Sequence, residues 1–157
     1  LMSSLIVRDS IRLDCAHLSL HIREVDRVEV RDTAGLLPLP AFVQGYEASL
    51  APITVCNPTT KKPVFMCGVC PVVEGHLKEG CVWMMATDEL IDVKYEFLRR
   101  STELLERISE PFDVVYNCVD KRNILHLRWL KWLGFIFLRE IPDYGVNKIP
   151  VYEFARI

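Results

Sequence analysis

The chain has 157 residues, of which 50% are hydrophobic and 25% are charged, and its formal net charge is −2 at pH 7. This length and apolar content predict a single domain with a substantial core over residues 1–157. Charges of both signs are interspersed, so no strong field attracts nucleic acid or an anionic bilayer, and neither is expected as a partner. The apolar stretches are shorter than the roughly 20 residues of a membrane helix. The first residues do not resemble a secretion signal, which favours a cytoplasmic protein.

Six cysteines are present, but a disulfide framework is typical of short secreted chains with poor cores. Most of them lie in apolar, strand-like runs, where a reduced thiol behaves as a small hydrophobe. Cys67 and Cys70, with His76 and Cys81 beyond them, resemble a series of zinc ligands. On a strand, however, Cys67 and Cys70 point to opposite faces, so no metal site is predicted.

The first third of the chain predicts a strand, a second short strand and a helix. Residues 5–7 form the first candidate strand. The mixed periodicity that follows predicts a strand over 17–22 and a helix over 24–33, which Gly35 ends. The proline-containing segment 36–51 is expected to cover one side of a sheet as a helix or a loop.

The middle of the chain predicts the centre of that sheet. Residues 53–56 and 64–69 are apolar or β-branched and are joined by turn-forming residues, which favours an antiparallel hairpin. Residues 81–86 are apolar on both faces and predict a central strand. Thr87 or Asp88 is expected to cap the longest helix, whose apolar stripe runs to Pro111.

The last third predicts a strand, a short helix and a closing hairpin. Residues 114–119 form a buried strand, and the helix between Arg122 and Gly134 ends at that glycine. The hairpin pairs residues 135–141 with 149–155 around a turn at 142–145.

This order of elements resembles the GNAT fold of acyl-CoA N-acyltransferases, most distinctively in the penultimate helix. In that family the helix carries Asn, a small residue three positions on and Tyr seven positions on, and Gly-Phe begins the next strand. Those places are held here by Asn123, His126, Leu130, Gly134 and Phe135. The resemblance implies a single α/β (α+β) domain with a central mixed, mostly antiparallel sheet of six to seven strands, flanked by about four helices.

A closer resemblance is to the internal virion protein A family of T-seven-like short-tailed phages. It covers most of the chain, through residues 23–29 with Gly35, residues 80–88 and above all residues 119–135. This resemblance implies a phage accessory protein of the host cytoplasm, or one associated with the virion. Such a protein acts by binding a phage or host protein, for example during assembly of the internal core of the virion.

The residues that normally carry acetyl transfer in the GNAT fold are altered. The fold holds the CoA pyrophosphate with a glycine-rich turn at a helix N-terminus, but residues 86–92 contain no glycine. Asp88, Glu89 and Asp92 instead place three carboxylates in the expected first turn, where they repel phosphate. Leu130 stands in the place of the proton-donating Tyr. The sequence therefore favours a non-catalytic protein that needs no cofactor, and the alternative is an acetyl-CoA-dependent N-acetyltransferase with a degenerate phosphate loop.

Each reading has its candidate residues. For the enzyme, Tyr116, His126 and Tyr144 are candidate proton donors, and Cys118 near His126 is a weaker candidate nucleophile. The resemblance assigns CoA contacts to a second set, namely Met84, Ala86, Asn123 and Arg128. For partner binding, the basic and aromatic helix offers Arg128, Trp129, Lys131 and Trp132, although Trp129 packed on the sheet beside solvated basic residues is the simpler interpretation. An enzyme also requires the strands of Trp83 and Val115 to separate and admit pantetheine.

Overall fold

The computed structural model describes residues 4–73 and 75–157, and within them the chain forms seven strands and five α-helices. In chain order the elements are β1 (Ile6–Asp9), α1 (Asp14–Leu20), α2 (Glu24–Ala34), α3 (Pro38–Ala48), β2 (Ile53–Cys56), β3 (Pro63–Val72), β4 (Glu79–Ala86), the 3-10 helix η1 (Asp88–Val93), α4 (Lys94–Ser109), β5 (Val114–Asp120), α5 (Ile124–Trp132), β6 (Ile136–Tyr144) and β7 (Ile149–Arg156).

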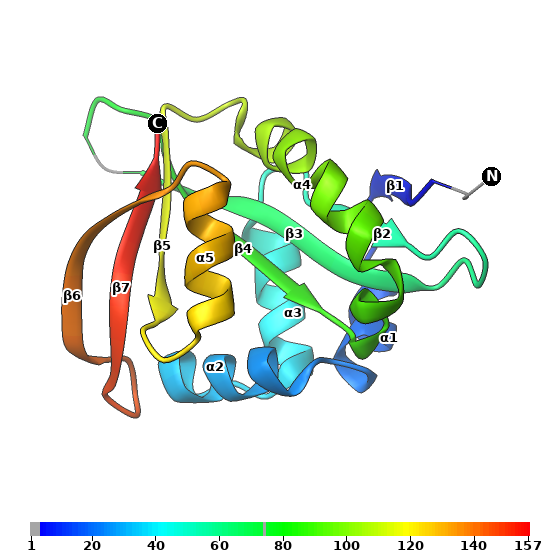
Figure 1. Ribbon diagram of the computed structural model, residues 1–157, viewed down its shortest axis with the longest axis horizontal. Coiled ribbons are helices and arrows are strands. Elements are labelled where there is room, and N and C mark those ends of the chain that lie inside the picture. The colour runs from blue at the N-terminus through cyan, green and yellow to red at the C-terminus, as the bar shows by residue number, and fades with distance from the viewer. Residues whose placement is uncertain (1–3, 74) are drawn as a thin grey trace.

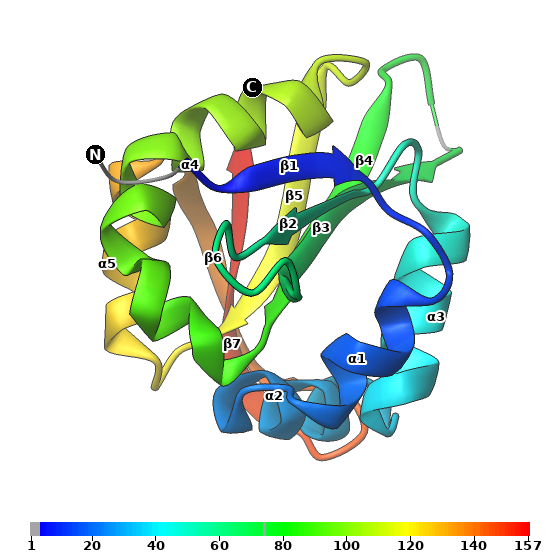
Figure 2. The ribbon, with the colours of Figure 1, turned by 90° about the vertical axis from the view of Figure 1, so that its right-hand side faces the viewer.

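The strands form one mixed sheet in the order β1-β2-β3-β4-β5-β7-β6. Neighbouring strands are antiparallel except β4 and β5, which are parallel. Helices α4 and α5 cover one face and α1 and α3 cover the other, while α2 lies along one end of the sheet (Figures 1 and 2). The expected mixed, mostly antiparallel sheet is confirmed, with β4 at its centre.

Each face of the sheet buries its own core. Under α4 and α5, Phe97 packs edge-on against Phe65 of β3 with ring centroids 5.1 Å apart. On the other face Phe42 of α3 is fully buried against Met66 and Met85. Because successive strand residues point to opposite faces, central strands that are apolar throughout serve both cores.

The strand expected over residues 17–22 is wrong, since α1 occupies residues 14–20. Helix α1 buries Cys15 and Leu18, three residues apart, against α3 and β3, and this spacing is helical. Its start is fixed by Asp14, which accepts hydrogen bonds from the Arg8 guanidinium and from the Ile11 backbone N–H. Asp14 also accepts from the Thr54 hydroxyl of β2 at 2.8 Å, and this long-range bond favours the helix in a segment of mixed periodicity.

Two further expectations need correction at element ends. Residues 88–93 form a 3-10 turn, so α4 begins at Lys94, and no side chain caps either helix. The closing turn lies at residues 145–148 rather than 142–145, because β6 continues to Tyr144. A register irregularity between Ile141 and Tyr144 takes up Pro142, which cannot donate to the ladder and is tolerated on an edge strand.

Candidate functional site

Strands β4 and β5 pair at one end only. Their register covers Glu79 to Cys81 against Val114 to Tyr116, and beyond it the strands separate. At the point of separation the Asn117 side-chain amide donates to the Val82 carbonyl oxygen at 2.7 Å. We call this opening between β4 and β5 the fork. The separation of these strands, which the enzyme reading requires, is confirmed.

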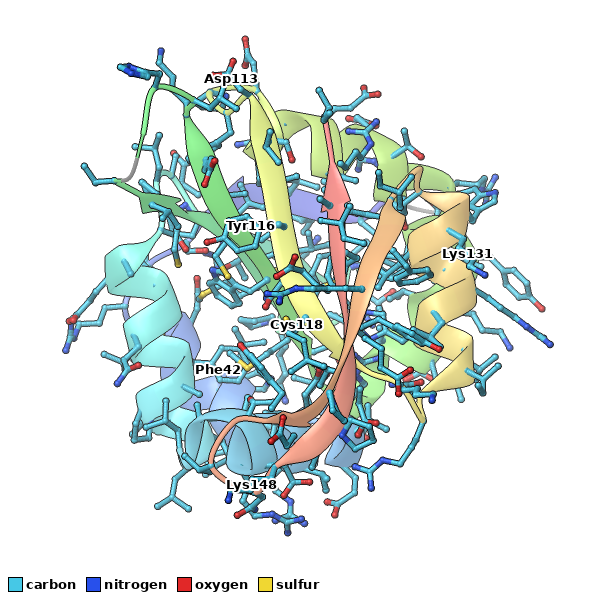
Figure 3. The ribbon with its side chains drawn as sticks, turned by 90° about the vertical axis from the view of Figure 1, so that its left-hand side faces the viewer. Phe42, Asp113, Tyr116, Cys118, Lys131 and Lys148 are labelled. Carbon is cyan, nitrogen blue, oxygen red and sulfur yellow. The ribbon has the colours of Figure 1, made fainter. Side chains whose placement is uncertain are left out.

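A cavity of about 1190 Å³ passes through the sheet at the fork. Leu98 of α4 and Trp129 of α5 line it on one face, and Val30 of α2 and Gly45 of α3 line it on the other. Figure 3 shows the molecule from the side of β6 and β7, with β5 seen lengthwise and Cys118, which also lines the cavity, labelled on that strand. Two ligands that enter from opposite faces can therefore meet between the strands.

Helix α2 closes the open end of the fork (Figure 1). At its N-terminus the Arg23 N–H donates to the Ala86 carbonyl at 2.8 Å, and the Ala86 N–H donates to the Asp26 carboxylate at 2.8 Å. Asp26 is 6% exposed and is also held by the Arg23 guanidinium at 2.9 and 3.0 Å. At the other end of α2, the N–H groups of Val146 and Asn147 donate to the carbonyls of Thr33 and Asp32. The helix is thus bound to β4 and to the β6–β7 turn.

On the α2 and α3 face the cavity wall carries Glu29, Cys118 and Tyr144. Burial, together with the Asp26 carboxylate, raises the pKa of Glu29 to about 7, although a hydrogen bond from the Asp120 backbone lowers it. Burial also raises the pKa of the Tyr144 hydroxyl and of the Cys118 thiol, which lie near enough to affect each other's titration. At neutral pH this wall therefore offers one titrating carboxyl group and two protonated groups.

On the α4 and α5 face the cavity wall carries His126 and Trp129. Burial lowers the pKa of His126 to about 4, so its imidazole is neutral at pH 7 and accepts protons poorly. Trp129 packs between Phe97 and His126, with ring centroids 5.4 and 5.7 Å away, and its buried indole N–H has no partner among the described residues. The Asn123 side chain caps α5 by accepting from the His126 N–H at 3.2 Å.

The expected crowding of carboxylates in the first turn of the long helix is also corrected. Asp88, Glu89 and Asp92 belong to η1, whereas the first turn of α4 has Glu96 as its acidic residue. Glu96 is paired with Arg99 at 3.0 Å. Lys94 starts α4 and lines the cavity, as does Asp88. The first turn of α4 therefore repels a phosphate less strongly than the sequence suggests.

The structure gathers some of the sequence candidates around the fork and leaves others outside it. Those on the cavity wall are Met84, Cys118, Asn123, His126, Trp129 and Tyr144. Tyr116 lies on β5, at the paired end of the fork (Figure 3). Both backbone groups of Ala86 are bonded to α2. Arg128, Lys131 and Trp132 are exposed on α5, and their role in partner binding stays a prediction.

Four residues that line the cavity were missed by sequence reasoning: Arg23, Asp26, Glu29 and Asn117. A weak signal existed, because Arg23, Asp26 and Glu29 recur at intervals of three and so share one face of α2. Asn117 carried a second signal, as a polar residue within an otherwise apolar strand.

Among the described residues, no group of three or more His, Cys, Asp or Glu side chains is arranged to hold a metal ion. Cys67 is buried beneath α4, whereas the Cys70 thiol lies 3.4 Å from the Ser49 hydroxyl of the α3 end, so the two point to opposite faces as expected. The six cysteines are free. Within the same residues, no helix is both long and apolar enough to span a membrane.

Comparison with known proteins shows the fold. No protein-family model and no curated protein matches the chain. A ribosomal-protein-S5-alanine acetyltransferase from Vibrio fischeri superposes with a TM-score of 0.70 at 12% identity, over 99% of this chain and 94% of its own. A GCN5-related N-acetyltransferase from Kribbella flavida gives 0.69 at 14% identity, over 98% and 97%. The ribosomal-protein-S18-alanine N-acetyltransferase from Escherichia coli gives 0.67 at 13% identity, over 96% and 92%. The chain has the GNAT fold, and the resemblance to the phage family stays a prediction.

Proposed function

We propose that this protein is a CoA-dependent N-acyltransferase that transfers an acetyl group from acetyl-CoA to an amine. The observation that carries the proposal is the cavity that crosses the sheet at the fork and is lined from both faces. Acyl transfer needs the amine nitrogen and the thioester carbon in contact while their remaining parts lie apart. The similar structures named as acetyltransferases support the fold on which this geometry rests, and the activity is our inference.

The residues on the α4 and α5 side fit acetyl-CoA. Met84, Leu130 and Phe97 give the fork an apolar wall suited to a slender arm. The unpartnered Trp129 indole N–H is a donor for an amide carbonyl of that arm, and Lys94 is a cation for the phosphates. The bound thioester supplies an activated acyl group, and the protein orients it.

The proton needed by the departing thiolate must come from a residue other than the one at position 130, where the GNAT fold usually has a tyrosine. Leu130 is 3% exposed and has no proton to give. Tyr144 lines the cavity with a raised pKa and is therefore protonated at neutral pH, so we assign it as the donor. The amine nitrogen bonds to the acyl carbon, the carbon–sulfur bond breaks, and the sulfur takes the phenolic proton. The nitrogen then gives up its surplus proton, which restores the Tyr144 phenol. His126, with its pKa of about 4, is a neutral imidazole at that pH and therefore a much weaker acid than an imidazolium.

Titration calorimetry with acetyl-CoA tests the proposal. We expect saturable binding in the micromolar range, and Lys94→Glu is expected to weaken it about tenfold because reversing a charge near a phosphate changes binding by roughly 1 kcal/mol or more. Lys131→Glu makes the same change on the outward face of α5 and should leave the affinity unchanged. Absence of heat at millimolar acetyl-CoA contradicts the proposal.

A second function, as an accessory protein that binds a protein partner, is favoured by the outward face of α5. Trp132 is 61% exposed there, beside the exposed Arg128 and Lys131, and Trp and Arg are enriched where partners bind most tightly. If acetyl-CoA does not bind, this becomes the better-supported function, and we would place it, as the phage resemblance implies, in the host cytoplasm or the virion.

A further inference from the structure

We propose that the acyl acceptor is an aliphatic primary amine that arrives as an ammonium ion, and that the Glu29 carboxylate binds it on the α2 and α3 side of the fork. This inference rests on the proposed N-acyltransferase function. It adds the charge and shape of the acceptor and the residue that recognises it.

The first step is the balance of charge on this wall of the cavity. Its charged residues are Asp26 and Glu29 of α2 and Arg23, which immediately precedes that helix. Arg23 and Asp26 neutralise each other through two hydrogen bonds, and Asp26 is further engaged by the Ala86 N–H. Glu29 is left as the carboxylate whose charge the wall does not balance.

The second step is that the nearby cationic side chains are already paired with other carboxylates. Arg122 binds the Asp120 carboxylate at 2.9 and 2.8 Å, and Arg139 binds Glu153 at 3.3 Å. Within residues 4–73 and 75–157, no salt bridge to Glu29 is found. A partly buried carboxylate without a cation is costly, so a cationic ligand gains more here than at the surface.

The third step is the shape and polarity of the surroundings. Beyond Glu29 the same face of the cavity is lined by apolar groups that include Val30, Leu36 and Trp83. It also carries Thr33, whose hydroxyl already donates to the Glu29 carbonyl, and Gln44, which is exposed. An alkyl chain is accommodated by such a wall, whereas most hydroxyls of an amino sugar would be left without partners. The wall therefore selects a slender aliphatic amine.

The fourth step concerns the proton that the ammonium must lose before it can attack. Two groups that face Glu29, Arg23 and Asp26, belong to the N-terminal part of α2 and the residue before it. Two others, Asp120 and Cys118, belong to β5, and Tyr144 of β6 lies beside Cys118. In this setting Glu29 titrates near neutral pH. The carboxylate accepts the proton from the ammonium nitrogen, and the freed nitrogen lone pair forms the new bond to the acyl carbon.

Two sources share this chemistry, a small diamine and the lysine side chain of a polypeptide. Calorimetry at pH 8 with protein saturated by CoA, and again without CoA, uses 1,4-diaminobutane and Nα-acetyl-lysine methylamide as probes, with 1,4-butanediol as the neutral control. We expect at least one amine to bind and the diol not to bind. The probe that binds more tightly identifies the source.

Glu29→Gln is expected to weaken amine binding about tenfold or more while the affinity for acetyl-CoA stays within about twofold, which also shows that the variant is folded. Glu29→Asp should restore part of the binding. The matched control is Glu24→Gln, which removes an exposed carboxylate from the same helix. Unchanged amine binding in Glu29→Gln, or equal binding of the diol, overturns the inference even if acetyl-CoA binds; failure of acetyl-CoA alone overturns the proposed function.

Discussion

Burial shifts Glu29 and His126 toward their neutral forms from opposite directions. The two side chains line the same cavity on different faces of the sheet. The pKa of Glu29 rises to about 7, and that of His126 falls to about 4, chiefly because each charged form loses water. An acid and a base therefore sit in one cavity with little charge between them at pH 6.

The shifted carboxyl of Glu29 predicts a dependence of stability on pH. Its folded pKa lies above the ordinary value of 4.5, so the folded state holds more protons between pH 4.5 and 7, and the Glu29 contribution to stability falls as pH rises through that window. Relative to wild type, Glu29→Gln should therefore gain on the order of 2–3 kcal/mol of unfolding free energy on going from pH 5 to pH 8.

Urea unfolding at the two pH values measures this gain. His126 contributes equally to both proteins, so its own titration cancels in the comparison. Glu24→Gln should follow the wild-type profile over this range. A Glu29→Gln profile parallel to wild type would show that the carboxyl titrates normally in the folded protein.

For single residues, the sequence indicated those that reach the cavity through the spacing of a helix better than those whose role depends on burial. Asn123 and His126 reach the cavity because the register of α5 puts them there. Glu29 reads as one more charge on a polar helix, and its environment depends on Asp120, which lies far along the chain. Contacts of that range have no local signature.

At the scale of secondary-structure elements, the short pairing of β4 with β5 requires a glycine at position 80. Gly80 pairs with Val115 in the middle of the three-residue register. A Cβ atom at Gly80 would lie 2.1 Å from Val69 Cγ1 and 2.9 Å from the Phe112 ring. These neighbours belong to β3 and to the loop before β5, so the glycine lets three segments converge.

Gly80→Ala is expected to cost about 1–3 kcal/mol of unfolding free energy, since the added methyl must displace packed side chains. Gly75→Ala is the comparison, because a Cβ there meets nothing within 4 Å and only its positive φ is strained. Chemical denaturation of both variants gives the difference. A loss at Gly80 no larger than at Gly75 would mean that the β3, β4 and β5 contacts rearrange freely.

The sequence predicted best the strands that are apolar over most of their length and the helix that a glycine ends. The runs of β4 and β5 are apolar over most of their length, and the helix Glu24–Ala34 ends at Gly35, whose φ of 67° is left-handed, as expected. The prediction failed at α1 and at the turn after Tyr144. In both places tertiary hydrogen bonds, from Thr54 to Asp14 and from the β6–β7 turn to α2, outweigh local preference.

For the whole molecule, the fork divides the sheet into two parts, β1 to β4 and β5 to β7. Three residue pairs and the Asn117 side chain join them at one end, and α2 joins them at the other. The bond network of Asp26 connects α2 to β4, alongside the bond from the Arg23 N–H to the Ala86 carbonyl.

Asp26→Ala should loosen α2 more than the rest of the protein. It leaves the Ala86 N–H and the Arg23 guanidinium unpaired, a loss of roughly 3 kcal/mol for a mostly buried pair. Amide hydrogen exchange should show faster exchange over residues 24–34, with β2 and β3 little changed. Glu24→Ala, at an exposed site on the same helix, should leave this pattern intact. Uniform acceleration across the sheet would show instead that α2 does not open separately.

Because α2 is bound to β4 at one end and to the β6–β7 turn at the other, the opening in the sheet has a closed perimeter. The perimeter runs along β4, through α2 to the β6–β7 turn, and back along β7 and β5 to the paired residues. A ligand cannot be laid into such an opening from the side, and it must pass through end first. Linear molecules with a bulky group at one end are therefore held by their thin ends, and branched molecules are kept on the face from which they arrive.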